Sequence, residues 1–266
     1  MLKVSLNSSL PSASVKFTKK NICAANIAYK LSSDFFQCSS QVSFKGRNEC
    51  INKSADSPLK LEVLPGVSQE FISMVTDEIS AFPKEWLHKF KDKGFKIIIA
   101  PTFKEAYASQ NVFDPTIEFF EKKNPLGTLG VTYTEGEFGK NFFVFADKPP
   151  YSNKFVDAIV PHELSHGVVS VAKLDKNEKV LKLIKNDIDL IIKQNKLHKL
   201  TPQERKLISH YFFSKTAYLP LDEIIADVYA WNKSKGCYGS GLVLGVQNPN
   251  LMKELFPSLS EYLNSL

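Results

Sequence analysis

The amino-acid sequence predicts an α+β fold with a small mixed β-sheet, one central helix and a helical C-terminal half. Two kinds of pattern support this prediction. Four short apolar or alternating runs of strand length lie between residues 59 and 146. After residue 150, apolar residues recur at helical spacing almost to the C-terminus, first in a segment at about 154–172 that carries two histidines.

The predicted strands are residues 59–64, 95–100, 126–133 and 141–146. The first alternates apolar and polar residues and ends at the Pro65-Gly66 turn, whereas the second is a continuous apolar run that Pro101 ends. The link at 135–139 contains two glycines, so the last two strands are expected to form a hairpin.

Capping residues and turn residues mark the predicted helices. Ser68 can cap a helix whose apolar residues lie between 71 and 79, and a second helix at 83–92 begins at Pro83 and is closed by Gly94. The segment Thr201-Pro202-Gln203-Glu204 is a capping box that starts a helix of about 202–213. Further helices are predicted at about 176–196, at 220–234 and after a Ser258 cap, with weaker helical patterns at 103–109 and 115–122.

Composition and charge divide the chain in two. The 266 residues are 43% hydrophobic, enough for one or two cores, and the formal net charge is +6. Residues 1–58 hold eight Lys and Arg against three acids, so the basic balance belongs mostly to this serine-rich segment, which we expect to be disordered. Residues 59–266 are then the folded domain. Their near-neutral charge does not favour nucleic-acid binding.

Cysteine usage and hydropathy exclude several classes of protein. The chain has four cysteines without a Cys-x-x-Cys pair, so neither a cysteine zinc site nor a disulfide framework is expected. No apolar run is long enough to span a membrane. Residues 1–30 lack the apolar core of a secretory signal and the arginine pattern of a transit peptide, which leaves a cytoplasmic location or export without a signal peptide. A monomer is expected.

The central pattern is His162-Glu163-x-x-His166. Residues four apart on a helix lie on the same face, so both imidazoles can bind one metal ion, while Glu163 can hold a metal-bound water. Only five histidines occur in the chain, which makes chance a poor explanation of this spacing. The alternative is an ordinary helix that happens to carry the pattern. The pattern favours a zinc peptidase.

Two histidines do not complete a catalytic zinc site, which usually has three protein ligands. The glycine and histidine that a metzincin would need after His166 are replaced by Val169 and Ala172, which excludes that class. The best third ligand is Glu223, on a predicted helix that also carries Asp227 one turn later, where a carboxylate could orient a histidine N–H. His198, His210 and Asp222 are weaker candidates, and an exposed acidic stripe is the alternative for the carboxylate pair.

These motifs resemble the catalytic domain of anthrax lethal factor and the related clostridial Pro-Pro endopeptidases, which are zinc metallopeptidases of the zincin class. The resemblance rests on His-Glu-x-x-His followed by Glu223-Ile224-Ile225-Ala226-Asp227, and on the order of the elements over 59–266. It implies Glu223 as the zinc ligand, Asp227 as the second acid, and an upstream tyrosine, Tyr218 or Tyr211, that stabilises the oxyanion. Pro161 inside the motif helix and the long insert at 176–210 depart from the family pattern.

The expected function is therefore that of a zinc-dependent endopeptidase with one catalytic Zn²⁺ and a peptide or protein substrate. Glu163 would act as general base on a zinc-activated water, and the strand at 127–133 would form the edge of the substrate cleft. Two alternatives remain open. One is a catalytically inactive, zincin-like binding or toxin-type module, and the other is metal-dependent hydrolysis of a non-peptide substrate.

Overall fold

The computed structural model describes residues 58–112, 130–134, 140–147, 152–202, 204–205, 208, 221–233, 248 and 250–266. The predicted N-terminal segment lies outside these residues apart from its last residue, as do Tyr211, Tyr218 and the weak helical pattern at 115–122. Within the described part of the chain, the α+β prediction is confirmed: a small mixed sheet is accompanied by a helical majority.

Four strands form the sheet: β1 (Lys60–Val63), β2 (Lys96–Ala100), β3 (Gly130–Tyr133) and β4 (Phe142–Ala146). Their order is β1-β2-β4-β3, in which β1, β2 and β4 are parallel and β3 runs antiparallel to β4 at one edge. The antiparallel pairing of β3 with β4, with Tyr133 opposite Phe142, agrees with the predicted hairpin, whose link lies outside the described residues.

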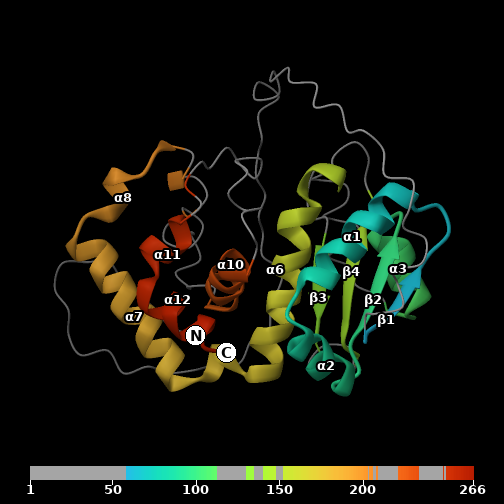
Figure 1. The fold of residues 1–266 in the computed structure, drawn as a ribbon, viewed down its shortest axis with the longest axis horizontal. Helices are drawn as coiled ribbons and strands as arrows, with labels where there is room; N and C mark the ends of the chain where they lie inside the picture. Colours follow the sequence, from blue (N-terminus) through green and yellow to red (C-terminus); the bar gives the residue numbers. More distant parts are fainter. Residues whose placement is uncertain are drawn as a thin grey trace.

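The helices are α1 (Gln69–Ala81), α2 (Lys84–Asp92), α3 (Phe103–Ser109), α6 (Ser152–Ala172), the 3-10 helix η3 (Leu174–Lys176), α7 (Glu178–Lys193), α8 (Lys196–Lys199), α10 (Leu221–Lys233), α11 (Leu251–Leu255) and α12 (Pro257–Asn264). Figure 1 shows α6 near the middle of the molecule, with the sheet and α1 to α3 on its right and α7 to α12 on its left.

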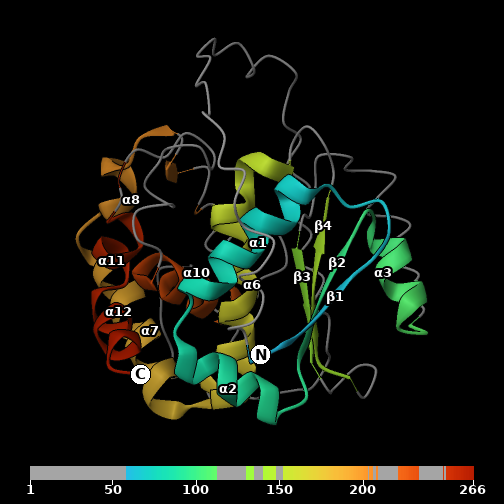
Figure 2. The same cartoon turned by 45° about the vertical axis from the view of Figure 1, so that its right-hand side comes forward.

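The two faces of the sheet bury different cores because successive side chains of a strand point to opposite sides. Ile97, Ile99 and Phe143 face the large core that α1, α2 and α6 share with the C-terminal helices. Ile98 and Val144 face a smaller core closed by α3. Figure 2 shows α3 on the opposite side of the sheet from α6. Helix α6 therefore packs on the face of the sheet that carries Ile97, Ile99 and Phe143.

Local sequence signals account for several helix boundaries. The Ser68 side chain caps α1 by accepting from the Phe71 N–H, as predicted. Gly94 follows α2 at φ +72°, a left-handed conformation that favours glycine. The predicted capping box is also present, since Thr201 Oγ1 accepts from the Glu204 N–H while the Glu204 carboxylate accepts from the Thr201 N–H.

The helix predicted at 176–196 is confirmed as α7, which begins two residues and ends three residues inside the predicted bounds, and Asn195 takes a left-handed conformation between α7 and α8. One capping prediction was wrong. Ser258 does not cap the last helix, because α12 begins at Pro257 and Ser258 lies inside it. The buried Asp187 carboxylate of α7 accepts from the Ser258 and Leu259 N–H groups instead. Asp187, which is distant in sequence, thus caps the start of α12 in place of Ser258.

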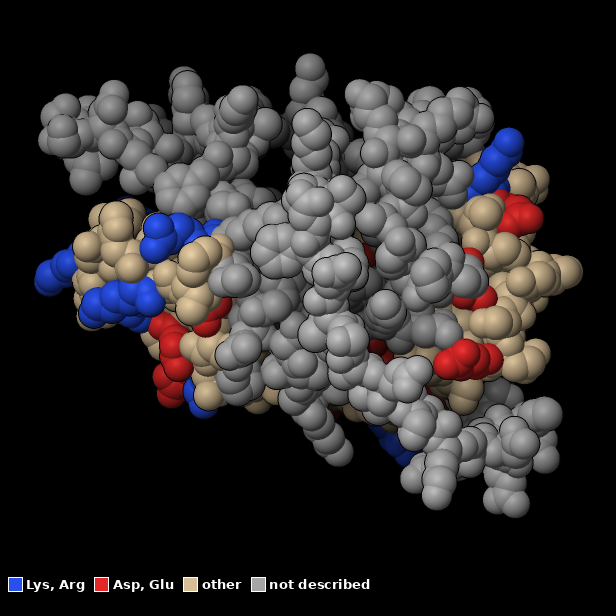
Figure 3. Space-filling view, turned by 90° about the horizontal axis from the view of Figure 1, so that it is seen from above, with Lys and Arg blue, Asp and Glu red and all other residues tan. Residues whose placement is uncertain are grey.

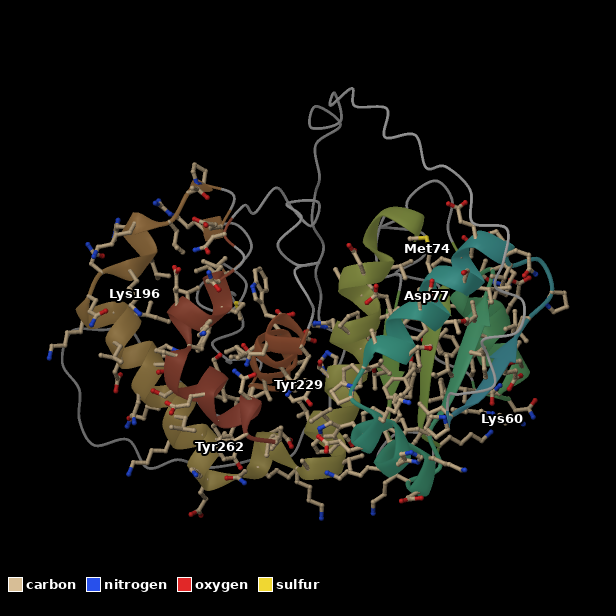
Figure 4. All side chains as sticks on the ribbon, in the orientation of Figure 1. Lys60, Met74, Asp77, Lys196, Tyr229 and Tyr262 are labelled. Carbon is tan, nitrogen blue, oxygen red and sulfur yellow. The ribbon has the colours of Figure 1, made fainter. Side chains whose placement is uncertain are left out.

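None of the described helices is both long and apolar enough to cross a bilayer. In the view of Figure 3, Lys and Arg side chains gather at the end of the molecule where α8 lies. Lys196 of α8, labelled in Figure 4, donates to the backbone oxygen of Glu254 and so ties α8 to α11.

Candidate metal centre

Helix α6 places the two motif histidines one turn apart on one face. Their Nε2 atoms lie 3.1 Å from each other, and their ring planes meet at 85°. Val160, Leu164 and Val168 are fully buried, so the apolar stripe anchors the helix as the sequence predicts. Both imidazoles are thereby held on a helix that is packed on a sheet.

Pro161 does not end α6, which continues from Ser152 to Ala172. Proline lacks a backbone N–H and so removes one hydrogen bond from the helix. One turn later, the buried Ser165 hydroxyl donates to the Pro161 carbonyl at 2.6 Å. Pro161 therefore leaves both histidines on the same continuous helix.

Helix α10 brings Glu223 to the two histidines. Ile224, Ile225 and Val228 are fully buried and fix the rotation of this helix against the core. Glu223 Oε2 then lies 3.4 Å from His162 Nε2 and 3.6 Å from His166 Nε2. A residue more than fifty positions further along the chain thus becomes the third donor.

These three donor atoms have the spacing that a metal ion requires. All lie within 4.8 Å of one another, and among the described residues no other group of three or more His, Cys, Asp or Glu side chains does so. Zinc bonds to nitrogen and oxygen at about 2.0–2.1 Å, so neighbouring ligands of a tetrahedral ion lie about 3.3 Å apart. The three distances between the donor atoms, 3.1, 3.4 and 3.6 Å, are close to that value.

The centre is partly open. The side chains of His162, His166 and Glu223 are 19%, 17% and 15% exposed, so they are neither fully buried nor free in solvent. Structural zinc sites are closed by four protein ligands, whereas catalytic sites keep one position for water or substrate. The three part-exposed donors form a group that could hold a metal ion.

Asp227 supports the first histidine from behind. Its Oδ1 lies 2.6 Å from His162 Nδ1, the ring nitrogen that faces away from the donor cluster. A carboxylate at this position keeps the proton on Nδ1, leaves Nε2 free to bind an ion, and fixes the orientation of the ring. Because Asp227 follows Glu223 by one helical turn, α10 supplies both carboxylates from one face.

The charges in the cluster stabilise one another. Burial by itself lowers the pKa of the His162 imidazole, but the Asp227 and Glu223 carboxylates outweigh burial and hold that pKa well above its usual range. Burial likewise lowers the pKa of His166, yet Glu223 raises it overall. Burial raises the pKa of the Glu223 carboxyl, but the two histidines hold it well below its usual range. Metal binding must therefore displace protons from the imidazoles.

Glu163 lies against the edge strand β3. Its side chain is buried, and the Thr132 hydroxyl oxygen is 2.6 Å from Glu163 Oε2 and 2.8 Å from the Glu163 backbone oxygen. A Cβ atom at Gly130 would lie 2.6 Å from both Glu163 Cγ and Ile159 Cγ2. Gly130 is therefore required for the close approach of β3 to α6.

Other candidates from the sequence do not join the cluster. His198 is exposed on α8, and Asp222 is not among the clustered donors. Tyr211, Tyr218 and His210 lie outside the described residues. Thr132 was not among the predicted site residues, and Gly130 was included only as part of the strand at 127–133 that was expected to edge the substrate cleft. Strand alternation places these two residues on one face of β3, but no local signal indicates that this face meets Glu163.

Comparison with known proteins finds one distant similarity. No model of a known protein family matches the chain, and no curated protein does. Among solved structures, the chain is similar to the Pro-Pro endopeptidase PPEP-2 from Paenibacillus alvei. The two share 12% sequence identity over 77% of this chain and 96% of that chain, with a TM-score of 0.44. A similarity of this extent does not assign a function.

Proposed function

We propose that this protein is a zinc-dependent endopeptidase of the zincin class. The convergence of His162, His166 and Glu223 at tetrahedral spacing, with the Glu163 carboxylate left outside the donor cluster, carries the proposal. A purely structural zinc site needs no additional carboxylate beside the first histidine. A hydrolytic site does, because it requires a group that accepts a proton from water.

His162, His166 and Glu223 would hold the ion, and Asp227 would keep His162 in the tautomer that binds through Nε2. Zinc, when bound there, supplies Lewis acidity, which activates water and polarises a peptide carbonyl. Glu163 accepts one proton from the attacking water and delivers it to the nitrogen of the cleaved peptide bond. The products are a carboxylic acid and an amine, and Glu163 returns to its ionised form.

The edge strand β3 is the proposed docking position for the substrate. Among the described strands, β3 pairs only with β4, so its other edge can accept the backbone of an extended peptide. One of the two tyrosines from the sequence analysis, Tyr218 or Tyr211, would stabilise the oxyanion that forms at the attacked carbonyl.

Metal content and peptide cleavage test this function. The full chain should contain about one zinc ion by mass spectrometry and should cut members of a peptide library. Glu223→Ala should lose or weaken zinc binding, because it removes one of three ligands. Glu163→Gln should keep the zinc but lose activity by about 10²–10⁴-fold, because it removes the general base.

The contrary outcomes are distinct. Zinc bound without any cleavage would replace the endopeptidase by the binding module. Cleavage only of non-peptide esters or amides would change the substrate class. Absence of zinc from the purified wild-type protein, even after zinc addition, would overturn the proposed metal centre.

A further inference from the structure

We propose that Thr132 is a positioning residue for the Glu163 carboxylate. Its hydroxyl holds Oε2 and leaves Oε1 for proton transfer. This inference rests on the proposed endopeptidase function and assigns to the edge strand β3 a second role besides docking of the substrate. It concerns a residue outside the metal-ligand set, on an element that precedes the motif helix in the chain.

The geometry of the contact supports a specific hydrogen bond. Thr132 Oγ1 lies 2.6 Å from Glu163 Oε2, which is within the range of a short bond between a hydroxyl and a carboxylate. The hydroxyl has one proton and two acceptors within reach, since the Glu163 backbone oxygen lies at 2.8 Å. The ionised carboxylate is the stronger acceptor, so the proton goes to Oε2.

Thr132 fixes the orientation of the Glu163 carboxylate. Among the described residues, only Thr132 donates a hydrogen bond to the Glu163 carboxylate, and it does so to Oε2 and not to Oε1. A glutamate has several rotatable bonds, so an unsupported carboxylate would sample many positions. Proton transfer requires the base to lie within hydrogen-bond reach of the water.

Gly130 and Thr132 act together because they lie two residues apart on β3 and face the same side. The missing side chain of Gly130 leaves room for the Glu163 stem, since a Cβ atom there would lie 2.6 Å from Glu163 Cγ. Thr132 then reaches the carboxylate at the end of that stem. The same strand β3 would therefore position both the substrate backbone and the Glu163 carboxylate.

Steady-state kinetics on the full-length zinc enzyme test this role. The substrate is the best-cleaved peptide from the library, prepared as a fluorescence-quenched probe. Thr132→Val keeps the shape of the side chain but removes the hydroxyl. It should lower kcat by about 10–100-fold, the range found when a supporting hydrogen bond is lost, with little change in KM. Thr132→Ser keeps the hydroxyl and should restore kcat to within about threefold of wild type.

The matched control is Thr76→Val on α1, where the hydroxyl donates to the Ile72 backbone oxygen of the same helix. This substitution should leave kcat and KM unchanged. A second readout is the Glu163→Gln background, in which adding Thr132→Val should cause no further loss, because the two residues act as a unit. Zinc content should remain at about one per chain in both Thr132 variants.

Failure of this inference differs from failure of the proposed function. Wild-type protein that binds zinc but cuts no peptide overturns the function, and this inference with it. Active wild-type enzyme with an unchanged kcat in Thr132→Val overturns the positioning role alone, as does a KM effect with unchanged kcat. If Thr132→Val does not fold, Thr132→Ala and Thr132→Ser replace it, and equal kcat values for those two variants would overturn the role of the hydroxyl.

Discussion

At the scale of single residues, the proposed metal centre includes a carboxylate that would not itself be a ligand. Asp227 Oδ1 lies 2.6 Å from His162 Nδ1, and its charge favours the ligand orientation of the ring. Asp227→Asn keeps the size of the side chain but removes its charge, so it should weaken zinc affinity by about 10–100-fold. Competition with a chromogenic chelator measures this change.

Asp92→Asn, at the exposed end of α2, is the control for loss of one carboxylate and should leave zinc affinity unchanged. Equal zinc affinity in Asp227→Asn and wild type would show that the His162 ring is held by other contacts.

Glu78 is a second carboxylate with an unusual environment, at the packing of α1 against α6. Burial, together with the nearby Asp157 and Asp77 carboxylates, raises its pKa to about 7. Figure 4 labels Asp77 on the same helix. The pKa of Asp157 is also raised by burial, and its buried Oδ1 has no hydrogen-bond partner among the described residues. Ionised Glu78 therefore opposes the folded state.

Because the folded pKa of about 7 exceeds the ordinary value of 4.5, the folded protein binds the Glu78 proton more tightly than the unfolded chain does. Stability from this group is present below about pH 4.5 and is lost as the pH rises through about 7. Glu78→Gln removes the charge. At pH 8 it should raise Tm by roughly 2–4 °C. The gain is limited because solvent screens part of the charge of a half-buried group.

At pH 5, just above the ordinary value of 4.5, the same substitution should have a much smaller stabilising effect. Thermal unfolding at the two pH values checks the prediction, with the exposed Glu261→Gln on α12 as control. A Tm gain of equal size at both pH values would rule out the titration of Glu78 as its cause.

At the scale of elements, the C-terminal helix α12 secures the helix that carries Glu223. Asp187 of α7 caps α12, and α12 in turn is bound to α10, since the Ser260 hydroxyl donates to the Asn232 side chain, which donates back to the Ser260 carbonyl. The ring of Tyr229, a residue of α10 that Figure 4 labels, packs against the ring of Phe82, and the two ring centroids lie 6.1 Å apart. Helix α10 is thus held from both sides.

Asp187→Ala should destabilise the fold by about 1–2 kcal/mol or more, because it removes a buried cap that serves two backbone N–H groups. Urea unfolding measures the change. Asp189→Ala, on the same helix but at an exposed position, is the control. A loss no greater than that of the control would show that α12 does not depend on this cap.

At the scale of the whole molecule, the proposed zinc site joins two groups of elements. Its histidines come from α6, which packs on the sheet, and its glutamate comes from α10 among the C-terminal helices (Figure 1). An ion that binds only the folded chain stabilises it by about 2.7 kcal/mol at a free concentration of 100 times Kd. A chelator should therefore lower Tm by roughly 5–10 °C.

Differential scanning calorimetry with and without a chelator measures the shift. The Glu223→Ala variant should respond much less, since its site lacks one ligand. A wild-type Tm that does not change on chelation, in protein shown to contain zinc, would place the ion away from the junction of α6 and α10.

The sequence by itself determined what depends on neighbours along the chain. The spacing of His162 and His166 is a property of one helix, and the apolar faces of α6 and α10 follow from periodicity. Glu223 and Asp227 could be predicted as site residues because they are two acids one helical turn apart, flanked by apolar residues of the same helix. The Ser68 cap and the capping box at Thr201 are likewise local and were predicted correctly.

Only the tertiary structure decided which elements meet. The distance of 3.4 Å between Glu223 and His162 depends on how α10 packs against α6. The contact of Thr132 with Glu163 depends on which face of β3 turns toward that helix. The predicted Ser258 cap is absent because the buried Asp187 carboxylate of α7 accepts from the N–H groups of Ser258 and Leu259 at the start of α12. Periodicity indicates which side of an element is buried, but the partner of that side is set by packing of the whole chain.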